Sequence, residues 1–317
     1  WLSDETGVVG EEAADYKTAM DFALGKLDQA IAIATSKDFS VPETWTTNPM
    51  SSSEFAKLMS AYGARMLVMN ARNSSDKASI DWNKVTNYAN NAIDADFNIY
   101  HDDVNWYDLV KTYLVYPGWA RVDLRIINLM DPSYPDYWPA NTTILPEANS
   151  VDARLATDFQ YLDGQNFRPE RGEYHYSSYR YSKWDEYISE WTVPTVEFSK
   201  TEIDMYLAEA KLNTGALADA AAIINAGSRT LRGNLPPVAA DATAIADAIH
   251  YERMVEMLLD APGLTFFEMR KENLLQQGTL LHFPVPGSAL ESIPADYYTY
   301  GGNEGEAGKD YSTGGWR

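Results

Sequence analysis

The chain has no cysteine among its 317 residues. Disulfides, thiolate metal sites and cysteine nucleophiles are therefore excluded. A chain of this length with 45% hydrophobic residues can bury a large core without cross-links, so the absence does not identify a compartment.

Basic residues are scarce. The 25 Lys and Arg residues face 46 Asp and Glu residues, which gives a formal net charge of -21. Such a charge repels phosphate backbones and anionic membrane surfaces, so we expect no nucleic-acid partner. Its simplest interpretation is a soluble exterior rather than a site for a cationic ligand.

Long apolar runs are also missing. No stretch approaches the roughly 18 apolar residues of a membrane-spanning helix. The chain begins at Trp1 and shows neither a signal sequence nor a lipidation cysteine, so we expect a processed or truncated chain.

Motifs of metal, nucleotide and redox chemistry are absent. The four histidines form no HExxH pattern, and no phosphate loop, dinucleotide fingerprint or nucleophile elbow occurs. The oxygen-rich segments 94–98 and 163–166 do not have EF-hand spacing and are better explained as turns. We therefore predict no metal and no cofactor.

Apolar spacing divides the chain into zones. Helical periodicity extends to about Tyr100. One stripe of apolar residues runs from Tyr16 to Ile31, and two more begin after Ser51 and after Asp81. It returns from 196 to 277, where Gly215 ends one helix and Pro236 precedes the next. Two capping boxes are predicted, each with Ser followed three residues later by Glu: Ser51 with Glu54, and Ser199 with Glu202.

Two helical hairpins are predicted, one in each helical zone. Ala208, Gly215 and Ala220 are small residues where a tetratricopeptide repeat places them. Small residues are also common wherever helices cross, so coincidence is the alternative. The predicted fold is mainly all-α, with tetratricopeptide-like hairpins, an aromatic-rich irregular insertion and a few short strands. We expect a single domain with zones 1–100, 101–195, 196–277 and an extended tail 278–317.

The most specific motifs lie near the C-terminus, in the order 251–258 (YERMVEML), 264–271 (LTFFEMRK) and 283–286 (FPVP). Together with the earlier helices, this order resembles the SusD/RagB family of outer-membrane nutrient-binding lipoproteins. The resemblance covers nearly all of this chain, which is similar to about the C-terminal two thirds of the family's pattern; the family's N-terminal part with its lipidated cysteine is missing. The segment 260–263 (DAPG) also departs from the family's Glu-Gly turn.

The resemblance implies a protein on the extracellular face of the bacterial outer membrane that is not an enzyme. Such a protein delivers oligosaccharides or peptides to a TonB-dependent, SusC-like transporter. Its only membrane contact is a lipid anchor, which this chain lacks.

Tryptophan and tyrosine concentrate between positions 100 and 191, which hold 17 of the 30, where an even spread would give about nine. These rings suit the C–H face of a pyranose. A long loop can also use them as its own small core. The predicted ligand-binding residues are two arginines, as anchors for hydroxyl or carboxylate groups, and nine aromatics: Arg121, Arg180, Trp106, Tyr107, Trp119, Tyr137, Trp138, Tyr176, Tyr179, Tyr181 and Trp184. The spacing of residues 174–181 also suggests a strand with one aromatic face.

We predict extracellular oligosaccharide binding, with peptide binding as the alternative. A glycoside hydrolase is a second alternative, because paired carboxylates could be drawn from Glu170, Glu173, Asp185, Glu186, Glu190 and Glu197. With so many acidic residues, however, such clusters arise on any solvated face. A helical-repeat scaffold that only binds a partner is a third possibility.

Overall fold

The computed structural model describes residues 14–102, 104–108, 111, 116–136, 144–164, 176–190, 192–275, 286–292, 294 and 296. The chain forms two compact units. Unit 1 comprises the residues up to Met66 together with Trp82–Pro262, and unit 2 comprises Leu67–Asp81 and the residues from Gly263 onward. The expectation of one domain with four zones stays a prediction.

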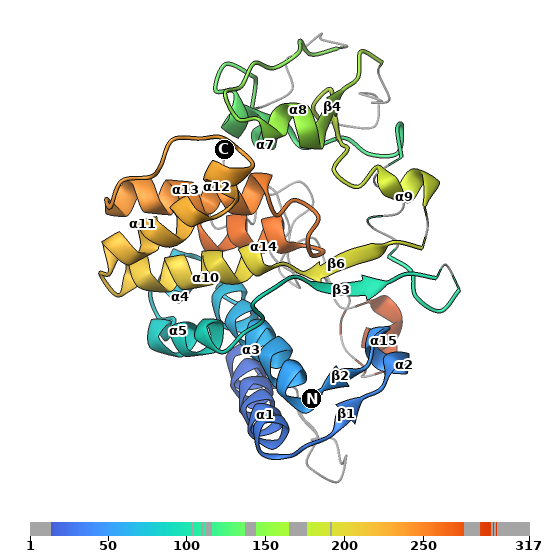
Figure 1. Cartoon of the computed structure of the whole chain (residues 1–317), viewed down its shortest axis with the longest axis vertical. Coiled ribbons are helices and arrows are strands. Elements are labelled where there is room, and N and C mark those ends of the chain that lie inside the picture. The colour runs from blue at the N-terminus through green and yellow to red at the C-terminus, as the bar shows by residue number, and fades with distance from the viewer. Residues whose placement is uncertain are drawn as a thin grey trace. The chain divides into compact units, whose positions relative to one another are not determined.

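The N-terminal half contains short strands between helices (Figure 1). Its elements are α1 (Tyr16–Ser36), β1 (Ser40–Val41), α2 (Glu43–Thr46), β2 (Met50–Ser51), α3 (Ser52–Met69), α4 (Ser74–Lys77), α5 (Trp82–Asn90), β3 (Phe97–Tyr100), α7 (Leu124–Met130) and α8 (Arg154–Asp158).

Helices dominate the remainder. Its elements are β4 (Phe159–Tyr161), β5 (Tyr179–Tyr181), α9 (Glu186–Ser189), β6 (Pro194–Phe198), α10 (Lys200–Asn213), α11 (Leu217–Ala226), α12 (Ser228–Leu231), α13 (Ala242–Val255), α14 (Leu264–Lys271) and α15 (Gly287–Ser292). The predicted fold class, mainly helical with a few short strands, is confirmed in the part of the chain that the structure describes. Most of the predicted extended tail 278–317 lies outside the described residues, and its described part differs from the prediction because it contains the helix α15.

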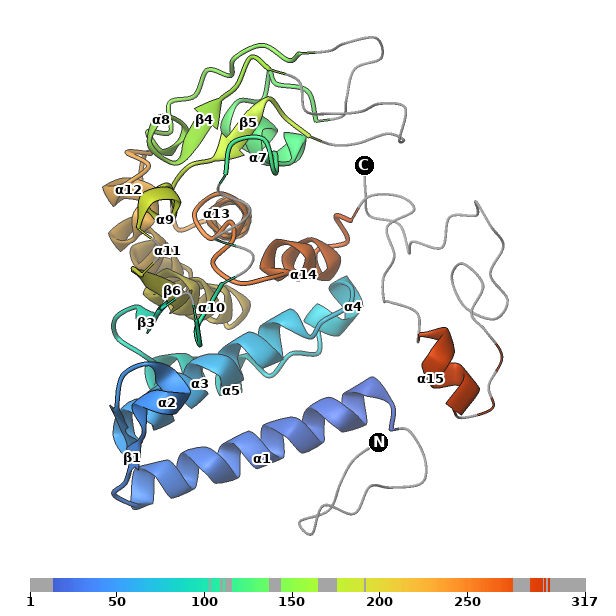
Figure 2. The ribbon, with the colours of Figure 1, turned by 90° about the vertical axis from the view of Figure 1, so that its right-hand side faces the viewer.

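The first helices form where their caps and apolar stripes predict. Asp15 caps α1 by accepting hydrogen bonds from the backbone N–H groups of Lys17 and Thr18. The capping box ahead of α3 is confirmed, because Glu54 accepts from the Ser51 N–H at 2.8 Å and Ser51 Oγ accepts from the Glu54 N–H at 3.3 Å. In Figure 2, α1 and α3 run side by side, and apolar residues of the two helices form one cluster: Leu27, Ala30, Ile31, Ala34, Phe55, Ala56 and Met59.

The predicted pairing of α3 with α5 depends on Gly63. A Cβ atom at this position would lie 2.8 Å from the ring of Tyr88 on α5, so only glycine lets the two helices approach this closely. The ring then donates its hydroxyl proton to Asp28 of α1, which joins three helices.

Helix α10 lies at the centre of unit 1, packed against α5, α11 and α13 (Figure 1). Ala208 on α10 and Ala220 on α11 are fully buried, as the hairpin pattern predicted. Gly215 has a φ of +82°, the left-handed conformation that ends a helix at little cost for glycine.

The second predicted capping box is only half formed. Ser199 Oγ accepts from the Glu202 N–H at 3.1 Å, as expected. The Glu202 carboxylate does not return to Ser199; it is fully buried and binds the Arg65 guanidinium of α3 through two hydrogen bonds of 2.7 Å. A buried ion pair between helices therefore takes the place of the expected cap.

Two antiparallel strand pairs belong to the aromatic zone: one flanks it and the other lies within it. Strand β3 pairs with β6, and β4 pairs with β5 in the register Phe159 with Tyr181. Both pairs lie within unit 1 and bring together segments that are distant in the sequence.

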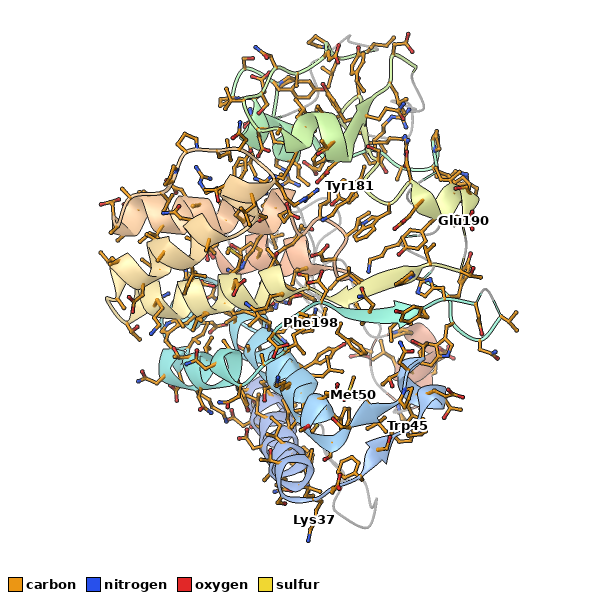
Figure 3. The ribbon with its side chains drawn as sticks, viewed as in Figure 1. Lys37, Trp45, Met50, Tyr181, Glu190 and Phe198 are labelled. Atoms are coloured by element: carbon orange, nitrogen blue, oxygen red, sulfur yellow. The ribbon has the colours of Figure 1, made fainter. Side chains whose placement is uncertain are left out.

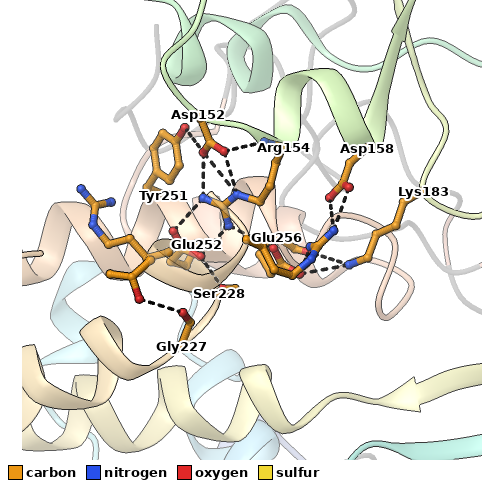
Figure 4. Close-up of polar contacts among 12 residues, drawn as sticks. Asp152, Arg154, Asp158, Lys183, Gly227, Ser228, Tyr251, Glu252 and Glu256 are labelled. Carbon is orange, nitrogen blue, oxygen red and sulfur yellow. Dashed lines mark hydrogen bonds and ion pairs between the residues drawn. The ribbon is translucent and has the colours of Figure 1, made fainter. Parts of the chain in front are cut away.

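A buried ionic network joins α8 to α13 (Figure 4). The Arg154 guanidinium contacts Asp152, Glu252 and Glu256 at 2.7 to 3.0 Å, and the Arg154 side chain is fully buried. Arg232 adds ion pairs to Asp158 and Glu256.

The motif residues of α13 divide between two faces. Glu252 and Glu256 are four residues apart, on one face, and bind Arg154. Arg253 is turned to α10 and binds Glu209 at 2.6 Å. Glu252 and Arg253 of the C-terminal motif therefore connect α13 to α8 and to α10.

Unit 2 has its own ionic cluster on the second motif. Lys271 of α14 is fully buried and contacts Glu268 at 3.0 Å and Glu272 at 3.2 Å. Glu272 also binds Lys77 of α4 at 2.7 Å. Glu272, which directly follows the motif, thus connects Lys271 of α14 to Lys77 of α4.

Replacing Arg154 with Met should destabilise the protein by about 3–5 kcal/mol, because it leaves Asp152 and Glu252 as buried charges without their partner. Urea denaturation followed by circular dichroism measures the change. The control is Lys57→Met, which removes an exposed ion pair with Asp94 and should cost at most about 1 kcal/mol. Equal losses in the two variants would show that the Arg154 network is not a main support of the fold.

Candidate functional site

A small sheet supports the centre of the aromatic zone. Residues 122–123 run antiparallel to residues 176–179: the Val122 N–H donates to the Tyr179 carbonyl at 2.9 Å, and the Ser177 N–H donates to the Val122 carbonyl at 2.8 Å. An isolated bridge pairs Asp123 with Tyr176. Residues 176–179 continue into β5, which pairs with β4, so this segment is held from two sides.

Three of the predicted rings lie inside the zone rather than on its surface. Tyr179, Tyr181 and Trp184 are exposed by only 2%, 3% and 8%. Tyr181 packs edge-on against Phe159 of β4 with ring centroids 5.3 Å apart, and Figure 3 shows its position. The predicted strand is present as β5, but the whole of it is buried. In this structure these rings have no solvent-facing side and pack the zone's own core.

Three other predicted rings are exposed: Trp119 by 67%, Tyr176 by 43% and Tyr107 by 42%. Trp119 ends the turn 116–119, closed by a hydrogen bond from its N–H to the Tyr116 carbonyl at 3.2 Å. This turn has Pro117 followed by Gly118 with a φ of +94°, which is the pattern of a type II turn. The turn presents the tryptophan to solvent.

Trp106, which is half-buried, and Tyr107 follow a second turn, formed on Asp102. The Asp102 carboxylate accepts hydrogen bonds from the N–H groups of Val104, Asn105 and Trp106 at 2.7 to 2.9 Å. These bonds hold the pKa of Asp102 far below its usual range. An ionised aspartate therefore fixes the loop that carries these two rings.

The two predicted arginines have different surroundings. Arg180 is 4% exposed and binds Gln160 at 2.6 Å and both carboxylate oxygens of Asp185 at 2.5 and 2.6 Å. Arg121 is half-buried; among the described residues it donates to the carbonyls of Ala120 and Gly164, and no carboxylate pairs with it. Burial and the nearby charge of Arg180 lower the pKa of Arg121.

The exposed surface centred on Trp119, Arg121 and Tyr176 is the candidate site, and we call it the aromatic surface. Tyr176 belongs to one of the paired segments, Arg121 directly precedes the other, and Trp119 lies two residues before Arg121. Sequence reasoning missed the loop at Asp163 and Gly164, which reaches Arg121. The Asp163-Gly164 pair predicted a turn, but nothing in the sequence indicated that this turn contacts Arg121. Tyr137 and Trp138 lie outside the described residues.

Two of the carboxylates considered for a hydrolase have partners, and Glu186 and Glu190 are exposed. Asp185 is engaged by Arg180, and Glu197 accepts a hydrogen bond from Tyr62 at 3.4 Å. Glu170 and Glu173 lie outside the described residues. Across the described residues, no group of three or more acidic or histidine side chains is arranged to hold a metal ion, and no helix is both long and apolar enough to cross a bilayer.

Comparison with known proteins gives structural matches only. No family model and no curated protein matches the chain. A SusD superfamily protein from Bacteroides vulgatus matches with a TM-score of 0.41 and 14% identity, over 77% of this chain and 64% of that one. A SusD-like protein from Bacteroides fragilis matches with a TM-score of 0.49 and 17% identity, over 83% of this chain and 62% of that one.

This chain therefore spans less than two thirds of the length of either solved structure.

Asp260 is a buried carboxyl group behind the buried rings. It faces Lys183, Lys111, Ser199 and Glu202, and Lys111 Nζ also contacts its backbone carbonyl at 3.3 Å. Burial raises the pKa of Asp260 from 3.8 to about 6, despite the two lysines.

Because the folded-state pKa of Asp260 lies above its unfolded value, its contribution to stability is fully present below pH 3.8 and is lost as pH rises through about 6. Between pH 4.5 and pH 7.5, Asp260→Asn should therefore gain stability relative to the parent by about 2 of the roughly 3 kcal/mol in unfolding free energy that the whole shift represents. Asp102→Asn serves as the control and should show almost no change over this range, because a lowered pKa places the pH dependence of Asp102 below its usual value of 3.8. A pH-independent difference for Asp260→Asn would contradict the burial effect.

Among the described residues, the Tyr181 hydroxyl is buried without a hydrogen-bond partner, whereas the Tyr179 hydroxyl accepts from the Ala148 N–H at 2.8 Å. Removing an unsatisfied buried group costs little, so Tyr181→Phe should leave the free energy of unfolding unchanged or raise it. Tyr179→Phe should lower it by about 1 kcal/mol. Chemical denaturation of both variants measures these changes. If Tyr181→Phe lowered the free energy of unfolding as much as Tyr179→Phe, the Tyr181 hydroxyl would have a partner in solution.

Proposed function

We propose that this protein binds oligosaccharides outside the bacterial outer membrane and delivers them to a TonB-dependent transporter, without catalysing a reaction. The observation that carries the proposal is the aromatic surface, where two exposed rings and an arginine without a carboxylate partner among the described residues share one support.

The chemistry of this surface suits a sugar chain. An indole or phenol face can cover the C–H face of a pyranose, while its polar edge bonds to hydroxyl groups. The Arg121 guanidinium offers several N–H donors to ring or hydroxyl oxygens, and its described contacts, both with backbone carbonyls, leave donors unused. The buried rings beneath keep the supporting sheet rigid, which lowers the entropy cost of binding.

The remaining parts of the proposal come from the resemblance of the C-terminal motifs. A cell-surface position, a lipid anchor and a SusC-like transporter partner are properties of the SusD/RagB family, and we extend them to this chain. The net charge of -21 agrees with a ligand that is neither nucleic acid nor an anionic membrane surface.

A glycan array with the intact protein should identify a bound oligosaccharide, whose affinity is then measured by calorimetry. Trp119→Ala and Tyr176→Ala should each weaken binding about tenfold, equivalent to about 1.4 kcal/mol for a lost stacking face. Phe22→Ala is the control, because it removes a ring of α1, which lies outside the aromatic zone, and should leave the affinity unchanged.

The other outcomes separate the alternatives. Unchanged affinity in both surface variants would rule out stacking at this site. Binding of peptides but no sugar would move the ligand class to peptides. New reducing ends after incubation with polysaccharides would identify a hydrolase.

A further inference from the structure

A second concavity lies in unit 1 outside the aromatic surface. It is a groove of about 370 Å³ between residues 48–57, which include β2 and the start of α3, and residues 93–100, which end in β3. Figure 3 labels Met50, which contributes to its wall. Its volume falls at the lower end of the roughly 300–1,000 Å³ range of small-molecule sites.

One face of β3 supplies a ring and an amide to this groove. Asn98 and Tyr100 are two residues apart, so they point to the same side of the strand, and both line the groove. Tyr100 is 47% exposed. A flat aromatic face next to an amide donor and acceptor is a combination that suits a sugar ring and its hydroxyl groups.

The opposite rim is held in a fixed conformation. Thr47 has a φ of +62°, an uncommon left-handed conformation for a β-branched residue. Its hydroxyl accepts a hydrogen bond from the Tyr100 N–H at 2.9 Å, and the Thr46 hydroxyl donates to the Asn48 carbonyl at 2.6 Å. These bonds tie the backbone at Asn48 to the end of β3, so the backbone positions that carry the Asn48 and Tyr100 side chains are set before a ligand arrives.

Two carboxylates in the wall have spare acceptor capacity. Glu54 uses Oε2 for both of its bonds to Ser51, and Asp96 uses Oδ1 to accept from the Lys200 N–H at 2.7 Å. Within the described part of the chain, no hydrogen bond reaches the second oxygen of either carboxylate. A carboxylate oxygen can accept from a sugar hydroxyl.

The charge of the groove selects against anions. Lys57 is paired with Asp94 at 2.7 Å, so Glu54 and Asp96 leave the wall net negative. Hydrogen bonds from Ser51 lower the pKa of Glu54 and keep it an acceptor at neutral pH. An acidic sugar or a phosphate would be repelled, whereas a neutral sugar can use the carboxylates as acceptors.

We propose that this groove, which we call the β3 groove, binds one or two rings of a neutral saccharide, separately from the aromatic surface. The proposal rests on the proposed function in its ligand class. It assigns Tyr100 to stacking, Asn48 and Asn98 to hydroxyl groups, and Glu54 and Asp96 to accepting hydroxyl protons.

The methyl group of Met50 is a direct reporter for this groove. Protein labelled with ¹³C in its methionine methyl groups can be titrated with maltose, cellobiose and lactose, and the Met50 signal is assigned by its absence in Met50→Leu. At least one disaccharide should shift the Met50 signal in a saturable manner, with a Kd of about 1 mM or below. Glucuronic acid should leave the signal in place, because the groove is acidic.

Variants separate the two sites. Tyr100→Ala and Asn98→Ala should each weaken the saturable shift about tenfold or more, whereas Phe22→Ala should not change it. Trp119→Ala tests independence: if it removes the Met50 response, the groove is not a separate site and the proposal is wrong.

The failure of each proposal is distinguishable. Oligosaccharide binding on the array, with no Met50 response to any disaccharide, would overturn the β3 groove and leave the aromatic surface standing. A Met50 response only to a basic peptide such as trilysine would overturn the saccharide assignment. No sugar binding by either measurement would overturn both proposals.

Discussion

The buried guanidinium of Arg154 is the interaction on which the arrangement of unit 1 depends. It joins a segment of the aromatic zone to helix α13 through Asp152, Glu252 and Glu256. Burying one cation and several anions is unfavourable by itself, and it becomes tolerable because each charge meets several partners at once. Arg232 and Lys183 supply the further cations that the four carboxylates of the network require. These ion pairs therefore fix both the position and the orientation of the segment that contains α8.

The aromatic surface depends on this attachment through a short chain of contacts. Helix α8 begins at Arg154 and leads directly into β4, which pairs with β5. The strand that follows Tyr176 and the segment that follows Trp119 are then aligned by backbone hydrogen bonds. The rings that pack this sheet have no exposed face, and the rings that remain exposed lie at its margin. The ionic network of Arg154 thus lies next to α13, the buried aromatic rings follow it, and the exposed rings come last.

Local signals predicted the helices well, and long-range partners account for what they missed. The stripes of α1, α3 and α11 and the turn at Gly215 follow from periodicity and capping within a few residues. Glu202 looked like a capping residue because its partner Arg65 is far away in the sequence. Aromatic residues gave the correct zone but not their exposure, since Tyr181 and Tyr176 are the same residue type with opposite environments. Strand β3 and its groove depend on β6, which no local pattern of residues 97–100 reveals.

Helix α13 illustrates how such a scaffold restricts sequence length. Glu252 and Glu256 face Arg154 while the adjacent Arg253 faces α10. One residue inserted early in this helix would turn everything after it by about 100°, which moves the carboxylates away from Arg154 and places Glu252, in the position of Arg253, opposite Glu209. The helix can therefore accept side-chain changes at exposed positions but not a change of length. Residues 236–240, which precede its cap at Asp241 and carry no helix, are where insertions would be absorbed.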